Sequence, residues 1–297
     1  MLTKKEFDIL TAIDSEGEKK SQRQLAKLCG YSVGTVNTTL SSLSEKHFIS
    51  DDKITSEGFE ALAPYKVQRA VFLAAGFGSR LVPITLNTPK SLIRVHGKMI
   101  IESLLDATVA AGIEEIVIVR GYLGEQFDAL IKKYPNIKFV ENPLYNEGNN
   151  ISSLLAAKQY LENAYIFESD IILKNPRLVT KYQFTSNYCG VPCERTDDWC
   201  ISVEKGRISG VEVGGINGFR MVGISYWTEN DGKKLSEDLE KVYKMPGGKE
   251  RFWDSVPLTY CNKDFNLALR PCSFDDFAEI DTYNELKAID GAYLIGN

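Results

Sequence analysis

From residue 69 onward, hydrophobic positions follow two alternating patterns. Apolar runs of four or five residues, typical of buried strands, occur at 69–73, 115–119, 137–140 and 164–167. Stretches with apolar residues at helical spacing separate them, at 99–111, 125–134 and 151–161. Strands that alternate with helices predict a parallel sheet in an α/β domain.

The pattern changes in the second half of the chain. Strand-like segments follow one another there without intervening helices, at 188–191, 199–203, 207–213 and 219–227. They predict an extension that makes the sheet mixed. Helical spacing returns at 232–243 and 282–289.

The first 65 residues have a pattern of their own. Three short helical segments precede a predicted hairpin in which 48–49 and 53–54 flank two aspartates. Ser21 and either Ser32 or Thr35 are suited to cap the second and third helices. This order resembles a winged helix-turn-helix domain, whose second motif helix enters the DNA major groove. The resemblance predicts base-reading positions at Ser32, Thr35, Asn37 and Thr38.

Charge leaves two roles open for this N-terminal domain. Residues 1–68 hold nine lysines and arginines against ten aspartates and glutamates, a net charge of −1. DNA-binding domains usually have a basic face, because phosphate contacts supply much of their affinity. DNA binding and a protein-binding or regulatory role on the same scaffold are therefore equal alternatives.

Composition narrows the class of protein. The 297 residues, 43% of them hydrophobic, suffice for two domains, here predicted at 1–65 and 69–297. No apolar run is long enough to cross a bilayer, and the polar N-terminus does not fit a signal peptide, so we expect a cytoplasmic protein with no membrane partner. Six cysteines without a Cys-x-x-Cys pair, and only two histidines, disfavour a zinc site. Cys189, Cys193 and Cys200 lie close in sequence and leave a metal site there as an alternative to reduced, partly buried thiols.

The stretch from Leu73 to Lys90 carries the main chemical signal. Its glycines, Gly76 and Gly78, follow a buried strand and allow a tight turn with exposed backbone N–H groups. Such a turn suits anionic oxygens, and Arg80 and Lys90 add two cations. The combination predicts a nucleoside triphosphate site.

Two carboxylates are placed to complete that site. Asp170 follows the strand at 164–167, and ligands of α/β sheets collect beyond the carboxyl ends of the strands. Asp281 follows another short apolar run and precedes a helix, so it is a second ligand, an N-cap, or both. Mg²⁺ binds through one or two carboxylates plus phosphate oxygens. The expected cofactor is therefore Mg²⁺, held by Asp170 and Asp281.

Tryptophan and acidic residues cluster in the second half of the chain. Asp197 and Asp198 precede Trp199, and Asp254 follows Trp253. Aromatic faces beside a carboxylate attract a quaternary ammonium group. The alternative is that these tryptophans fill the core, which is their usual place.

The stretch Leu73-Ala-Ala-Gly-Phe-Gly-Ser-Arg80 with Pro89-Lys90 resembles the signature of nucleotidyltransferases that make activated sugars and alcohols. Further stretches resemble the bacterial CTP:phosphocholine cytidylyltransferases: 83–90, 121–128, 145–150, 196–199, 223–227, 252–254 and 279–281. The resemblance spans residues 69–290. It implies a Rossmann-like nucleotidyltransferase fold with a mixed sheet, preceded here by the small winged-helix domain.

The resemblance also implies roles for individual residues. Arg80 would contact the β- and γ-phosphates, Lys90 the α-phosphate, and Asp170 and Asp281 the Mg²⁺. The nucleotide would be bound by Leu73, Ala74, Ala75, Gly76, Gly78, Asn149 and Asn150. Choline would be surrounded by Trp199, Trp253 and Asp254. Glu168 stands where family members often have an aspartate, so its role is an open question.

The implied reaction transfers CMP from CTP to phosphocholine, giving CDP-choline and pyrophosphate for cell-surface decoration. One alternative is the same chemistry on 2-aminoethylphosphonate, another phospho-alcohol or a sugar 1-phosphate. Another is a transcriptional regulator that senses CTP or CDP-choline. The sequence leaves the oligomeric state open, and a homodimer is compatible with it.

Overall fold

The computed structural model describes residues 1–15 and 19–294, which form two compact units. The first unit comprises Met1–Lys66 together with the short segment Tyr182–Phe184. The second comprises the rest of the described chain. The predicted range 69–297 ends in three residues that lie outside the described ones.

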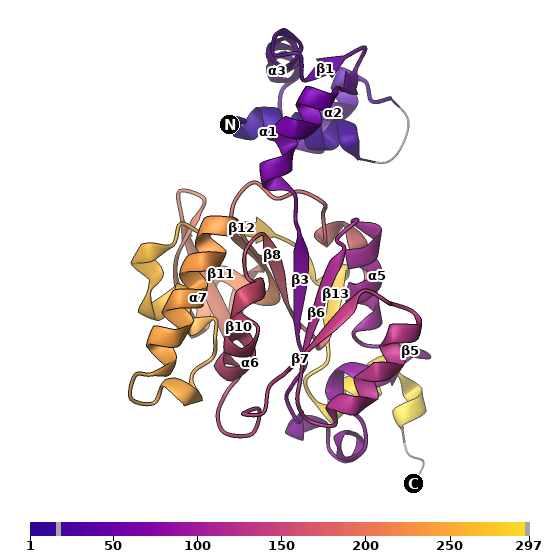
Figure 1. The fold of residues 1–297 in the computed structure, drawn as a ribbon, viewed down its shortest axis with the longest axis vertical. Helices are drawn as coiled ribbons and strands as arrows, with labels where there is room; N and C mark the ends of the chain where they lie inside the picture. The colour runs from indigo at the N-terminus through magenta and orange to yellow at the C-terminus, as the bar shows by residue number, and fades with distance from the viewer. Residues whose placement is uncertain (16–18, 295–297) are drawn as a thin grey trace. The chain divides into compact units, whose positions relative to one another are not determined.

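The first unit has the predicted winged helix-turn-helix order (Figure 1). Its elements are α1 (Lys4–Asp14), α2 (Gln22–Cys29), α3 (Val33–Glu45), β1 (Ile49–Ser50), β2 (Lys53–Ile54) and α4 (Ser56–Leu62). Ser21 caps α2 in a capping box with Gln24, and Ser32 caps α3 by accepting from the Thr35 N–H. The two strands pair antiparallel around Asp51 and Asp52, both at positive φ.

The second unit is built on a seven-stranded mixed sheet (Figure 1). Its order is β10 (Asn187–Glu204), β12 (Ala268–Pro271), β11 (Arg207–Trp227), β8 (Ala164–Glu168), β3 (Arg69–Leu73), β6 (Glu115–Arg120) and β7 (Ile137–Glu141). The four predicted parallel strands are adjacent in this order, and β11 joins them antiparallel to β8. The structure thus confirms the α/β fold with a mixed sheet.

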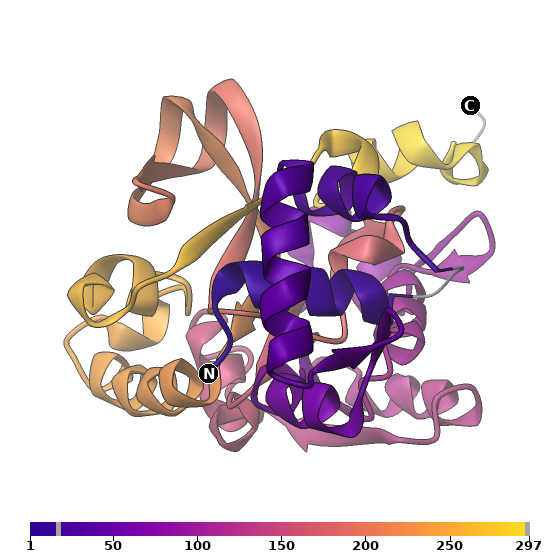
Figure 2. The same ribbon diagram turned by 90° about the horizontal axis from the view of Figure 1, so that it is seen from above.

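The extension differs from the prediction in how its segments are joined. The four strand-like segments form two long strands, β10 and β11, which pair antiparallel along nearly their whole length as a twisted ribbon (Figure 2). Register shifts interrupt this pairing near Trp199 and Cys200. Exposed polar residues and positions of irregular pairing lie between the apolar runs of each strand. In the sequence, each long strand therefore looks like two short ones.

Alternate residues of the central strands face two separate cores. Ala70 and Phe72 pack with α5 (Glu102–Ala110), whereas Val71 and Leu73 pack with α6 (Ile151–Ala156) and α7 (Glu229–Tyr243).

Two predicted helices are shorter or tighter than expected. The segment Gly124–Lys132 is a 3₁₀-helix, and the helix predicted at 151–161 ends at Ala156, before the 3₁₀ turn Lys158–Tyr160.

A small sheet outside the main one brings the C-terminal region to the strand ends. There β13 (Phe277–Glu279) pairs antiparallel with β9 (Ile171–Leu173), so that Glu279 faces Ile171. The N–H of Ile280 donates to the carbonyl of Asp170 at 3.1 Å. Helix α8 (Tyr283–Ile289) then begins after its N-cap, Thr282. The last pair of strands, β4 (Arg94–Val95) and β5 (Lys98–Met99), forms a short hairpin.

Within the residues that the structure describes, no helix is long and apolar enough to span a membrane.

Candidate active site

The predicted phosphate loop leaves the carboxyl end of β3. Leu73 is the last strand residue, and the Ala74 N–H donates to the Val119 carbonyl at 2.9 Å, so both belong to the buried sheet edge. The open part of the loop begins at Gly76. Gly78 has φ +69°, and a Cβ there would lie 3.1 Å from the Lys90 Cβ. Glycine is therefore needed at this position both for the turn and for the close approach of Lys90.

Lys90 is the centre of the site. Its ammonium group donates to Asp170 Oδ2 at 2.7 Å and to Asp281 Oδ1 at 2.8 Å. Arg80 donates to the same Asp281 oxygen at 2.9 Å. The Lys90 side chain is only 16% exposed, whereas that of Arg80 is 65% exposed. The structure thus brings together four residues that are up to 201 positions apart in the sequence.

The charges in this cluster stabilise one another. Burial alone would lower the pKa of Lys90, but the carboxylates of Asp170 and Asp281 outweigh it and raise the pKa. Burial likewise opposes ionisation of Asp281, yet Lys90 and then Arg80 hold its pKa below the usual value. Lys90 is therefore a protonated cation between two carboxylates.

Asp281 is not an N-cap, because Thr282 caps α8 with its own side chain. The backbone N–H of Asp281 instead donates to Glu285 Oε2 at 2.8 Å. Its carboxylate is left to face Lys90 and Arg80. This geometry excludes the N-cap alternative, and the metal-ligand role of Asp281 stays a prediction.

The donor set fits a divalent cation. Asp170 Oδ1 is buried and has no hydrogen-bond partner among the described residues, although Oδ2 of the same group binds Lys90. A buried carboxylate oxygen without a partner is costly, and a bound cation would remove that cost. Together with Asp281, it offers the hard oxygen ligands that Mg²⁺ prefers.

Glu168 belongs to a buried hydrogen-bond network beside this cluster. Its Oε1 accepts from the Asn150 side-chain amide at 3.0 Å and from the Trp253 indole N–H at 2.9 Å. Asn150 also accepts from the Trp253 backbone N–H at 2.9 Å. Burial, followed by repulsion from Asp254 and Asp170, raises the pKa of Glu168. The sequence analysis named Asn150, Glu168 and Trp253 but did not predict that they form hydrogen bonds with one another.

Trp253 and Asp254 lie in the interior. The Trp253 ring is 2% exposed and stacks on Tyr188, with ring centroids 5.9 Å apart. Asp254 is also buried, and it accepts from the Tyr188 hydroxyl at 3.0 Å. The placement of Trp253 is thus that of a core tryptophan, the alternative weighed for it from the sequence.

Trp199 lies apart from this pair of residues. It is half-buried in β10 and meets the exposed Phe252 edge to face, at 5.6 Å between centroids. Nearby, Arg220 of β11 forms ion pairs with Asp198 at 3.2 Å and Glu279 at 2.7 Å. Sequence reasoning missed Arg220 and Phe252. In the sequence, Phe252 only directly precedes Trp253, and Arg220 only lies within the expected strand 219–227.

Asn149 fixes the start of α6. Its Oδ1 accepts from the Asn150 N–H at 2.8 Å, and its own N–H donates to the Lys249 carbonyl at 2.7 Å. The two predicted nucleotide-binding asparagines therefore also anchor the segment from Lys249 to Trp253.

The predicted DNA-reading residues lie on the first part of α3 and at its N-cap. Ser32, Asn37 and Thr38 are exposed, and Thr35 is partly buried. Asn37 Oδ1 accepts from Gln22 at 3.4 Å, which connects α3 to α2. The helix Val33–Glu45 contains no lysine or arginine.

Comparison with protein families separates the two parts of the chain. The model described as nucleotidyl transferase matches residues 69–188. The model described as winged helix-turn-helix DNA-binding matches residues 2–50.

Individual relatives and structures match the second part. The chain is 37% identical over 229 residues to a 2-aminoethylphosphonate cytidylyltransferase of Lancefieldella rimae, covering 76% of this chain and 93% of that one. It is 31% identical over 224 residues to a choline-phosphate cytidylyltransferase of Haemophilus influenzae, covering 74% and 95%. The solved CTP:phosphocholine cytidylyltransferase from Streptococcus pneumoniae has a TM-score of 0.70 at 29% identity, covering 75% and 98%.

The buried carboxyl of Asp254 predicts a pH-dependent stability. Burial raises its pKa to about 7, whereas in the unfolded chain it should be near its usual value of about 3.9. At pH values between the two pKa values, Asp254 is deprotonated in the unfolded chain but still protonated in the folded protein. The free energy of unfolding therefore falls as pH rises. The contribution is complete below about pH 4 and is lost by about pH 7.

We expect Asp254→Asn to flatten the decline in stability between pH 5 and pH 7, as measured by urea unfolding followed by tryptophan fluorescence. Part of the decline should persist because the pKa of Glu168 is raised as well. Asp197→Asn is the control, since that side chain is 94% exposed. Equal pH slopes for wild type and Asp254→Asn would contradict the assignment.

Proposed function

The chain belongs to the nucleotidyltransferase family, with cytidylyltransferases among its relatives, and from this we propose that it transfers CMP from CTP to a small phosphorylated or phosphonylated amine. The observation that carries the proposal is the cluster of Lys90, Arg80, Asp170 and Asp281 at the strand ends. Two cations and two carboxylates suit a triphosphate and its divalent cation.

The proposed reaction needs no general base. An anionic oxygen of the acceptor phosphate or phosphonate attacks the α-phosphorus of CTP, forming a new P–O bond. The bond from the α-phosphorus to the bridging oxygen breaks, and pyrophosphate leaves with the electron pair. Because the nucleophile is already ionised, the protein contributes by orienting the reactants and neutralising charge.

Each residue of the cluster has a proposed task. Lys90 would stabilise negative charge on the α-phosphate, and the more exposed Arg80 would hold the β- and γ-phosphates. The loop from Leu73 to Gly78, with Asn149 and Asn150, would contact the nucleotide. Nucleotidyltransferases generally use divalent metal ions. Asp170 and Asp281 would hold Mg²⁺, which when bound neutralises phosphate charge and polarises the phosphoryl group.

We infer that the acceptor is a primary amine of the 2-aminoethylphosphonate type, with phosphocholine as the competing candidate. A primary ammonium donates hydrogen bonds, whereas trimethylammonium cannot. The proposal is supported by the 37% identity to a 2-aminoethylphosphonate cytidylyltransferase. It is also supported by the burial of Trp253 and Asp254, two of the three residues expected around a quaternary ammonium. Phosphocholine is supported by Trp199 and Phe252, whose rings could contact a quaternary ammonium.

The N-terminal unit suggests a second function. The match of residues 2–50 to a winged helix-turn-helix DNA-binding model favours DNA binding. We infer that the bases would be contacted by Ser32, Thr35, Asn37 and Thr38. Since α3 has no basic residue, phosphate contacts would have to come from other segments, such as Arg23 and Lys27 in α2. The competing hypothesis is a protein-binding or regulatory role for the same unit.

Lys90→Ala should lower kcat by about 10²- to 10³-fold, because a preorganised charge on the α-phosphate would be lost. Pyrophosphate release from CTP and a saturating acceptor measures this, and circular dichroism checks the fold. Lys98→Ala removes an exposed lysine nearby in the sequence and should leave kcat unchanged. An unaltered kcat in folded Lys90→Ala would exclude the proposed role.

An acceptor panel tests the substrate. With CTP, we expect kcat/KM for 2-aminoethylphosphonate to exceed that for phosphocholine, phosphoethanolamine and glucose 1-phosphate by at least about tenfold, a difference of about 1.4 kcal/mol. Trp199→Ala should affect phosphocholine more than the primary amine. A preference for phosphocholine would reject the primary-amine acceptor, while turnover of none of the four would reject the proposed acceptor class.

DNA binding can be tested with the full chain in electrophoretic mobility shifts, using the DNA upstream of its own coding sequence and random DNA as competitor. We expect a specific complex that Asn37→Ala weakens about tenfold, corresponding to one lost base contact. Glu60→Ala, in α4, is the control. Adding CTP or CDP-choline tests the sensor hypothesis. Equal affinity for specific and random DNA would favour the protein-binding or regulatory alternative.

A further inference from the structure

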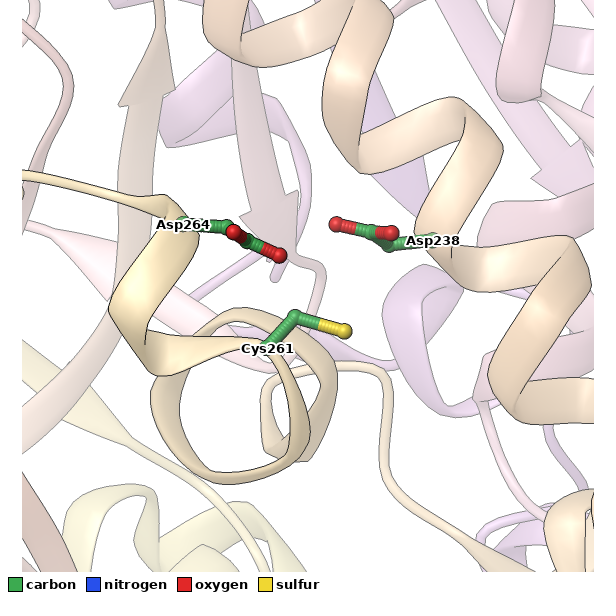
Figure 3. A group of neighbouring side chains, drawn as sticks. All are labelled: Asp238, Cys261 and Asp264. Carbon is green, nitrogen blue, oxygen red and sulfur yellow. The ribbon is translucent and has the colours of Figure 1, made fainter.

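Three potential metal ligands converge at a place that the proposed reaction does not use. They are Asp238 in α7, Cys261 directly after the π-helix Val256–Tyr260, and Asp264 at the end of the 3₁₀ turn Asn262–Asp264. One ligand atom from each lies within 4.8 Å of the other two. Figure 3 shows the two carboxylates turned toward each other, with the thiol beside them.

Asp238 supplies an independent sign of a missing partner. Its side chain is only 2% exposed, and Oδ1 accepts from Lys241 at 2.7 Å. Its other oxygen, Oδ2, is buried without a hydrogen-bond partner among the described residues. An unsatisfied oxygen on a buried carboxylate costs free energy, so a native protein usually provides it with a partner. The carboxylate points toward Asp264 in Figure 3, so that a cation between them would fill this role.

The net charge of the cluster and its neighbouring lysines is compatible with a bound cation. Lys241 binds Asp238 from one side, and Lys234 lies 3.7 Å from Asp264 Oδ2. With Cys261 as a thiolate, the cluster would carry three negative charges against these two lysines. Lys241 also fixes the orientation of Asp238, much as outer hydrogen bonds orient the ligands of known metal sites.

The ligand types indicate which metals would bind. A thiolate disfavours Mg²⁺ and Ca²⁺, which prefer oxygen, whereas carboxylates disfavour purely soft ions. Zn²⁺ accepts both kinds of ligand, usually in tetrahedral geometry. Asp264 is exposed, so an ion and a water molecule as fourth ligand can enter from solvent.

We propose that Asp238, Cys261 and Asp264 form a binding site for a divalent transition-metal ion of the Zn²⁺ type, separate from the Mg²⁺ site proposed at Asp170 and Asp281. Such an ion would connect α7 to the segment 256–264 and stabilise this part of the second unit. The sequence disfavoured a zinc site because it has no Cys-x-x-Cys pair and only two histidines. Those patterns could not reveal this cluster, because two of its three potential ligands are aspartates.

The site can be tested on the full chain after chelator treatment and reduction. Cd²⁺ is the first probe, because a cadmium–thiolate bond gives an ultraviolet charge-transfer band that carboxylates do not give. We expect a band at one Cd²⁺ per chain, lost in Cys261→Ser and retained in Cys193→Ser. Asp264→Asn, at an exposed position, should weaken Cd²⁺ binding at least about tenfold, the effect of one lost ligand interaction of about 1.4 kcal/mol.

Zn²⁺ is the second probe, with thermal unfolding as the readout. A hundredfold excess over Kd should raise Tm by several degrees in the wild type and in Asp170→Asn, but not in Cys261→Ser. Retention of both the cadmium band and the Tm increase in Cys261→Ser would overturn the proposal. Absence of both in the folded wild type would overturn it equally.

Discussion

A single ammonium group, that of Lys90, holds two carboxylates from distant segments of the chain in place. Asp170 and Asp281 would repel each other at this spacing, and the cation between them makes their approach favourable. Gly78 is part of the same constraint, because a side chain there would press on Lys90. The predicted phosphate loop, the end of β8 and the region after β13 are thus arranged around one charge.

Backbone hydrogen bonds contribute to the same arrangement. Pairing of β13 with β9, extended by the bond from Ile280 to Asp170, brings residue 281 to the carboxyl ends of β3 and β8. The strand ends of an α/β sheet are where its ligands collect. The charged cluster therefore includes a residue from the C-terminal region without a long flexible loop.

Beside the charged cluster, a polar hydrogen-bond network fixes the segment around Trp253. Glu168, Asn150 and Trp253 satisfy one another, so that the segment leading to Trp253 is connected to the strand that ends near Asp170. Such networks are rigid when every member is satisfied. The orientation of Trp253 thus follows from hydrogen bonding as well as from packing, which is why its role could not be assigned from its residue type.

Local pattern determined much of this molecule. Apolar runs and helical spacing predicted the strands β3, β6, β7 and β8, and capping residues predicted the starts of α2 and α3, because these signals act over a few residues. The sequence likewise assigned Lys90, Asp170 and Asp281 to one predicted site, although not the direct contacts between them. Tertiary structure alone decided that Trp253 is buried, that Arg220 reaches Glu279, and that four short apolar runs belong to two long strands. These features depend on contacts between distant segments, which local spacing does not encode.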